Sequence, residues 1–134
     1  MKKNRIRSGM SIMLMLMLFA NYALAAMVTP YADTVFSSAR VSLSTQMDAS
    51  FTAQTKSKQA EIKVTSCILQ IKTGSVWADS MTLTAPSKVA TNTSRYSAAK
   101  DYSSSCSSGN TYRIKAVFDA DGHTKTAYSN SISY

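Results

Sequence analysis

The sequence predicts an all-β, antiparallel β-sandwich that follows an N-terminal signal peptide. Three observations support this prediction. Ser and Thr supply 34 of the 109 residues from Ala26 onward, whereas the strong helix formers Leu and Glu occur there three times and once. Short segments that alternate apolar and polar residues recur at intervals of about 10 residues. No segment shows a helical period.

The N-terminus has the three parts of a secretory signal peptide. Basic residues open the chain, an apolar run follows, and the small residues Ala23 and Ala25 precede the expected cleavage point. We therefore expect a signal peptide over 1–25, an N-terminal extension over 26–36 and a β-sandwich domain over 37–134. The apolar run is far shorter than the roughly 20 residues of a membrane-spanning helix, so we expect a secreted product without a stable membrane anchor.

Cleavage would remove four of the fifteen basic residues and none of the seven acidic ones, which lowers the net charge from +8 to +4. The eight lysines and three arginines that remain are scattered along the chain. Arginine is the residue expected where phosphates or bases are read, so nucleic acid is not a predicted partner. Weak attraction to an anionic envelope polymer or membrane surface is one interpretation of this charge. A solvated surface is the favoured one.

Period-2 alternation predicts strands over 39–44 and 49–54, and a polar turn is expected over 55–59. The next predicted strand, 61–72, changes its inward phase from even to odd positions near Thr65. Either a β-bulge resets the register there, or the strand is buried on both faces further along.

A strand over 76–83 is expected after a glycine turn, and Pro86 ends it. The following stretch, 87–110, holds many small polar residues without a clear period. It is the least clear part of the sequence, and no strand is assigned to it.

The clearest signal is a C-terminal hairpin. Apolar residues alternate over 112–119, Asp121-Gly122 supplies a turn with positive φ, and the chain returns over 124–134. The residues of the last strand expected on the core face are Tyr128, Ile132 and Tyr134.

Cys67 and Cys106 are the only two cysteines. An even number in an exported chain predicts one disulfide, which would close a loop of about 40 residues and contribute roughly 4 kcal/mol. It would also tie the Ser-rich segment around Cys106 to the strand that carries Cys67. Two free thiols are the alternative. A metal site is not expected, because two cysteines and one histidine do not supply four ligands.

Short motifs in the C-terminal part of the chain resemble known proteins. The strand 112–117, the Asp121-Gly122 turn and Tyr128-Ser129-Asn130 resemble the last hairpin of fibronectin type III and immunoglobulin-like domains. With 67–70 and 74–77, the same strand is also similar to a group of small secreted proteins of Gram-positive gut bacteria that form a family of unknown function. The resemblance implies a fold and an exported location. It implies no activity.

Two motifs suggest chemistry, and each has a simpler explanation. His123 is the only histidine, so an acid–base or Ser-His-Asp mechanism would have to run through it. Its position after a glycine turn favours an exposed hairpin tip. The segment 119–122 resembles part of a calcium loop, but the acidic ligands required at Val117 and Tyr128 are missing, so a turn is favoured. We predict no catalytic residue, no metal and no cofactor.

Trp77, Tyr96 and Tyr102 are the candidate ligand-contact aromatics. Trp77 could form a stacking platform for a sugar ring or another partner, although core packing at the edge of the sandwich is favoured. Tyr96 and Tyr102 are expected on the surface.

The sequence thus predicts a secreted, non-enzymatic domain that binds another protein or an envelope or host polymer. A secreted antimicrobial or toxin-like effector is the alternative. A structural surface component is the third hypothesis, and a hydrolase is the fourth.

Overall fold

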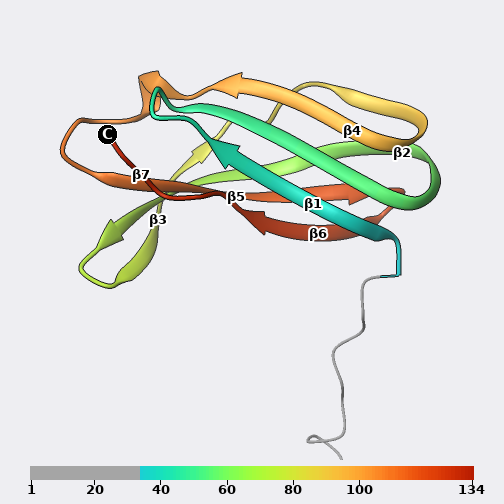
Figure 1. Cartoon of the computed structure of the whole chain (residues 1–134), viewed down its shortest axis with the longest axis horizontal. Helices are drawn as coiled ribbons and strands as arrows, with labels where there is room; N and C mark the ends of the chain where they lie inside the picture. The colour runs from blue at the N-terminus through green and yellow to red at the C-terminus, as the bar shows by residue number, and fades with distance from the viewer. Residues whose placement is uncertain (1–33) are drawn as a thin grey trace, which may run out of the picture. The chain divides into compact units, whose positions relative to one another are not determined.

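A computed structural model describes residues 34–134 (Figure 1). The predicted signal peptide, 1–25, and residues 26–33 of the predicted extension, 26–36, lie outside the described residues. The described part is all-β, as the sequence predicts, and its only helical element is a 3-10 turn, η1. The elements are β1 (Phe36–Leu43), β2 (Asp48–Thr73), β3 (Val76–Leu83), β4 (Val89–Asp101), η1 (Ser103–Ser105), β5 (Thr111–Ala120), β6 (His123–Tyr128) and β7 (Ile132–Ser133).

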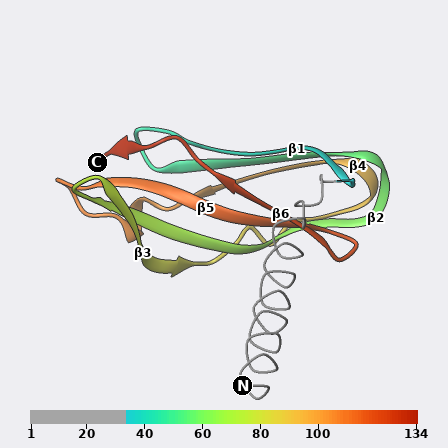
Figure 2. The same ribbon diagram turned by 90° about the horizontal axis from the view of Figure 1, so that it is seen from below.

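The whole sheet is built on β2, a single strand of 26 residues. Its first part lies between β1 and β4, and its last part lies between β3 and β5. Residues 59–63, just beyond the bend, still pair with the start of β4. The β2–β4 register shifts between Gln54 and Gln59, where β2 bends and turns back (Figure 2). The polar turn predicted over 55–59 is therefore a bend within one continuous strand.

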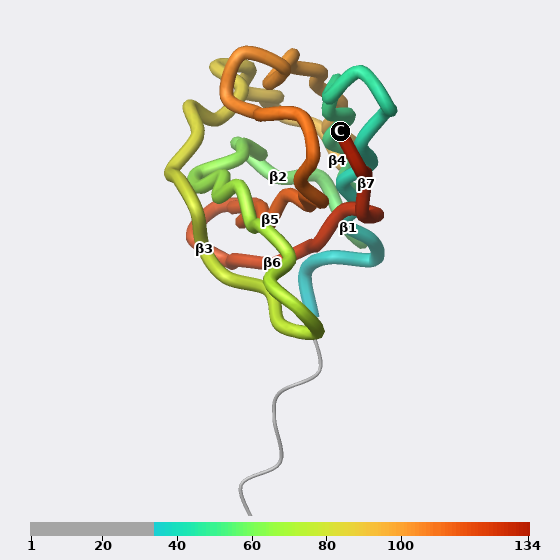
Figure 3. The backbone as a smooth tube through the Cα atoms, turned by 90° about the vertical axis from the view of Figure 1, so that its left-hand side faces the viewer, coloured from blue at the N-terminus to red at the C-terminus, as the bar shows by residue number. Residues whose placement is uncertain are grey.

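The bend curls the sheet around its own inner face (Figure 3). We call β1, the first part of β2 and β4 the first half of the sheet, and β3, the last part of β2, β5 and β6 the second half. All strands are antiparallel and hydrogen-bonded into one sheet. The predicted division into two separate sheets of a sandwich is not confirmed, because β2 belongs to both halves.

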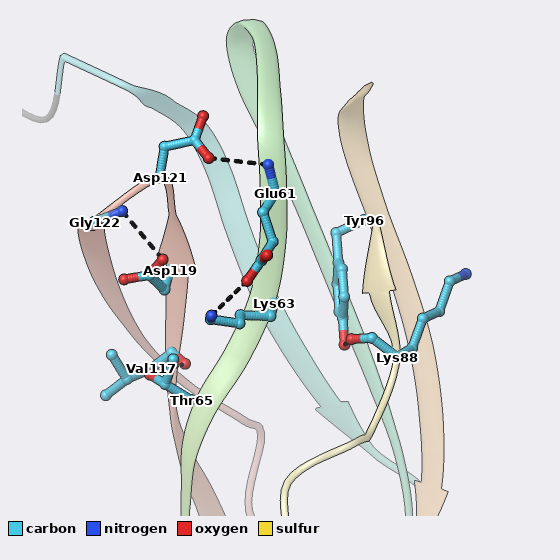
Figure 4. Close-up of polar contacts among 9 residues, drawn as sticks. All are labelled: Glu61, Lys63, Thr65, Lys88, Tyr96, Val117, Asp119, Asp121 and Gly122. Carbon is cyan, nitrogen blue, oxygen red and sulfur yellow. Dashed lines mark hydrogen bonds and ion pairs between the residues drawn. The ribbon is translucent and has the colours of Figure 1, made fainter. Parts of the chain in front are cut away.

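The register change predicted near Thr65 is a β-bulge. The β2–β5 pairing shifts between Val64 and Ser66, so that Val64 and Cys67 are both buried while Thr65 is exposed. The Thr65 hydroxyl donates to the Val117 carbonyl oxygen at 3.4 Å (Figure 4). The extra residue restores the core phase in the second half of the strand.

The predicted C-terminal hairpin is also confirmed. Asp121 and Gly122 have φ values of 49° and 88°, and they connect β5 to β6. The Asp121 carboxylate accepts hydrogen bonds from the backbone N–H groups of Ala60 (2.8 Å) and Glu61 (2.9 Å), which fixes the turn to β2. Figure 4 shows the bond from Glu61. Asp119 Oδ1 accepts from the Gly122 N–H at 3.2 Å. Both carboxylates of the predicted turn therefore bind backbone amides.

The stretch with the least clear sequence pattern, 87–110, contains β4. Its two tyrosines lie in the core, so their predicted surface position is wrong: Tyr96 is 2% and Tyr102 is 3% exposed. Tyr96 packs edge-on against Phe118 of β5, with ring centroids 6.1 Å apart, and this contact joins the two halves of the sheet. Tyr102 packs edge-on against Phe51 at 6.4 Å.

The buried tyrosines also hold the connection between β3 and β4. The Tyr96 hydroxyl donates to the Lys88 carbonyl oxygen at 3.1 Å (Figure 4), and the Tyr102 hydroxyl donates to the Thr84 carbonyl oxygen at 2.8 Å. Each phenol thus places its ring in the core and satisfies its polar atom at the edge.

The predicted face of the last strand is wrong at Tyr128. Ala127 lies opposite the buried Ala116, so the neighbouring Tyr128 lies opposite Lys115 on the outer face and is 50% exposed. Tyr134 is 37% exposed, and only the partly buried Ile132 packs against the core.

An asparagine side chain bridges β1 and the chain that follows β6. The Leu43 N–H donates to Asn130 Oδ1 at 2.9 Å, and Asn130 Nδ2 donates to the Leu43 carbonyl oxygen at 2.9 Å. The amide therefore satisfies both backbone groups of a buried residue, as a neighbouring strand would.

We predict that Asn130→Ala destabilises the domain by about 1–3 kcal/mol, because it leaves both backbone groups of Leu43 without these partners. Urea unfolding followed by circular dichroism measures the change. Ser131→Ala, one residue away and exposed, is the matched control. Equal stability of the two variants would contradict the bridging role of Asn130.

Candidate binding site

The strand register brings polar and aromatic side chains together on the outer face of the second half of the sheet. Gln70 of β2 lies opposite Asp79 of β3 on one side and opposite Arg113 of β5 on the other. Trp77 lies two residues from Asp79 along β3, and Tyr128 comes from β6. We call these five residues the aromatic–arginine cluster.

The guanidinium of Arg113 contacts two aromatic rings. Its central carbon lies 4.4 Å from the centroid of the Trp77 ring and 4.6 Å from the centroid of the Tyr128 ring. Both distances are within the range of cation–π attraction, worth roughly 0.5–1 kcal/mol each at exposed sites. Trp77 is half-buried and Tyr128 is half-exposed, so parts of both rings face solvent.

A hydrogen-bonded chain fixes the orientation of the guanidinium. Arg113 Nε donates to Gln70 Oε1 at 2.7 Å, and Gln70 Nε2 donates to Asp79 Oδ1 at 2.7 Å. Gln70 is only 7% exposed, so its amide has little freedom to rotate. The carboxylate of Asp79 thereby acts on Arg113 through Gln70 without pairing with it directly.

This arrangement leaves the outer nitrogens of Arg113 available to a ligand. Within residues 34–134 the only ion pair joins Lys63 and Glu61, so no carboxylate of the described chain neutralises Arg113. A planar guanidinium with free Nη donors binds a carboxylate or another oxyanion through two parallel hydrogen bonds. The site therefore combines an oriented anion receptor with two apolar ring surfaces.

Sequence reasoning identified one member of this cluster in advance. Trp77 was a candidate aromatic, but core packing was the favoured interpretation, and the structure places its ring against an outward-facing arginine. The alternation over 112–119 gives Arg113 no role, and the predicted position of Tyr128 is in the core. The cluster comes from strands far apart in the sequence, so no local motif identifies it.

The other residues for which the sequence suggested chemistry do not form a site in the described part of the chain. His123 is exposed at the start of β6, and no hydrogen bond to its side chain is found among residues 34–134. The same residues contain no group of three or more His, Cys, Asp or Glu side chains arranged to hold a metal ion. No helix in the described part of the chain is long and apolar enough to cross a membrane.

The predicted disulfide is not formed, and both cysteines are free. Cys67 is completely buried in the last part of β2, and burial raises the pKa of its thiol, an effect that the neighbouring Tyr102 hydroxyl opposes. Cys106 follows η1 and is half-buried at the edge of the core, where burial and then the Asp101 carboxylate raise its pKa. The two thiols therefore lie in different surroundings.

The Ser-rich segment is held by hydrogen bonds in place of the disulfide. The Tyr112 hydroxyl accepts from the Ser107 N–H at 3.0 Å and from Asn110 Nδ2 at 3.3 Å. The Gly109 N–H and the Asn110 carbonyl oxygen both pair with the backbone of Tyr134. One buried tyrosine and the C-terminal backbone thus fix the segment.

No protein-family model, no curated protein and no solved structure matches this chain. The resemblance to secreted Gram-positive proteins stays a prediction from the sequence.

We predict that the folded protein reacts slowly with a thiol reagent, Cys106 before Cys67, because both pKa values are raised and less thiolate is present at a given pH. The reaction rate should rise with pH, and the rise should occur at pH values above the usual thiol pKa. Ellman titration should find two thiols per chain after unfolding without reductant, and Cys106→Ser should remove the faster phase. Detection of no thiol in the unfolded protein would contradict the structure.

Proposed function

We propose that this domain is an exported, non-enzymatic binding module that recognises a protein partner through the aromatic–arginine cluster. Export rests on the signal peptide predicted for 1–25. The observation that carries the proposal is the Arg113 guanidinium, 4.4 and 4.6 Å from two partly exposed rings and oriented by Gln70.

The residue types support a protein as the partner. Trp, Tyr and Arg are the residues most enriched among those that dominate binding energy at protein interfaces. Here one of each lies in contact on one sheet face, from β3, β6 and β5. A side-chain carboxylate of the partner would pair with the Arg113 fork, and its aliphatic part would cover the rings of Trp77 and Tyr128.

The contacts that already hold Arg113 in place also favour binding of a partner at this cluster. A free arginine side chain loses considerable rotamer entropy when a partner immobilises it. In this domain the two rings and the Gln70 amide already restrict Arg113 before any partner arrives. Binding at this site therefore costs less side-chain entropy than binding to an arginine without such contacts.

Affinity capture from the extracellular and envelope fractions of the producing cell tests this proposal. The baits are the wild-type domain, Arg113→Lys and Thr124→Ala, an exposed residue of β6 outside the cluster. We predict that the wild type and Thr124→Ala retain the same protein. Arg113→Lys keeps the charge but loses the planar fork, and should weaken binding by about 2 kcal/mol or more, roughly 30-fold.

Trp77 is the only tryptophan, so its emission reports directly on the cluster. Titration of the purified partner should change the Trp77 emission of the wild-type domain with the same affinity as the capture experiment. The proposal is wrong if no protein depends on Arg113 for retention, or if the retained protein leaves Trp77 emission unchanged.

A further inference from the structure

The outer face of the first half of the sheet carries a separate basic groove of about 570 Å³. Arg40 of β1, Arg95 of β4 and Lys88 from the β3–β4 connection line this groove, and all three side chains are exposed. No acidic residue lines it. The floor is formed by hydroxyl and amide side chains, among them Thr52, Gln54 and Ser97.

The register sets the spacing of the two arginines. Arg40 lies opposite Thr52 of β2, and Arg95 lies opposite Gln54, so the arginines flank β2 with an offset of two residues. At about 4.8 Å between strands and 3.4 Å per residue, their Cα atoms are separated by about 12 Å across the face. This separation allows the two arginines to contact successive anionic groups of an extended ligand.

The charge of the groove is not neutralised by the described chain. The ion pair found between residues of the range 34–134, Lys63–Glu61, lies outside the groove. Asp48 and Asp101 face each other at the other end of the β2–β4 pairing. Asp48 is four residues from Thr52 along β2, about 13 Å at the usual rise. The positive potential of the groove is therefore available to an anionic ligand.

The groove continues in both directions. It shares Lys88 and Ser97 with a second depression that reaches Lys100, and it shares Arg40 and Thr52 with a third that crosses toward β6. No acidic residue lines either extension. A continuous path of this kind fits a linear polymer better than an isolated ion.

The side chains between the arginines favour a sugar polymer over a nucleic acid. Thr52, Gln54 and Ser97 can exchange hydrogen bonds with sugar hydroxyls. Of the residues that line the groove itself, the only aromatic one is Tyr96, which is 2% exposed, and the half-exposed Tyr128 lines only the third depression. No ring is therefore available between the two arginines to stack on a base. We propose that this groove binds a linear anionic polysaccharide, with its carboxylate or sulfate groups on Arg40 and Arg95.

Isothermal titration of the full exported chain with dextran sulfate, polygalacturonate and neutral dextran tests the proposal. We predict binding to the two anionic polymers, weaker at higher ionic strength, and none to neutral dextran. The double variant Arg40→Gln/Arg95→Gln should weaken binding about tenfold or more. Lys58→Gln/Lys72→Gln removes the same net charge from exposed positions outside the groove and should weaken binding less than about threefold.

Thermal melting of both double variants checks that they fold like the wild type, and the comparison between them separates the site from net charge. Equal weakening by the two double variants would overturn the proposal. So would tighter, arginine-dependent binding to oligo(dT) or to phosphatidylserine vesicles than to either polysaccharide, because the groove would then serve another class of ligand.

Discussion

The bend in β2 is the constraint on which the rest of this structure depends. One strand of 26 residues pairs with β1 before the bend, with β3 and β5 after it, and with β4 on both sides of it, so the two halves of the sheet share a covalent and hydrogen-bonded backbone. Side-chain contacts then hold the curl closed. The Tyr96–Phe118 pair joins the halves through the core, and Asn130 bridges to Leu43 where β1 has no backbone partner from the other half.

The curl of the sheet also determines which residues a partner can contact. The inner face is filled by the core, so partners have access only to outward-pointing residues and loops. On the second half those residues form the aromatic–arginine cluster, and on the first half they form the basic groove. The composition of the chain suits this division, because its many hydroxyl side chains tolerate exposure on a strand and can hydrogen-bond to ligands.

Much of the fold could be predicted wherever the alternation was strong. Over β5 every second residue is buried, as predicted, and the phase change near Thr65 is a real bulge. In β4 the inward positions between Tyr96 and Tyr102 are Ala98 and Lys100, so the alternation is interrupted and the strand was missed. The core position of Tyr128 was predicted from the parity that it shares with Ile132 and Tyr134, whereas its register opposite Lys115 places it on the outer face. The cluster depends on such cross-strand register, which one sequence does not encode locally.

Amide hydrogen exchange along β2 tests the central claim that one bent strand unites both halves. If it does, the slowest amides before the bend, in 48–54, and after it, in 62–71, open with the same free energy, equal to that of global unfolding. Both should also shift together in Asn130→Ala. Exchange of one half at a free energy at least about 2 kcal/mol lower than the other would show two units that unfold separately, and would contradict this account.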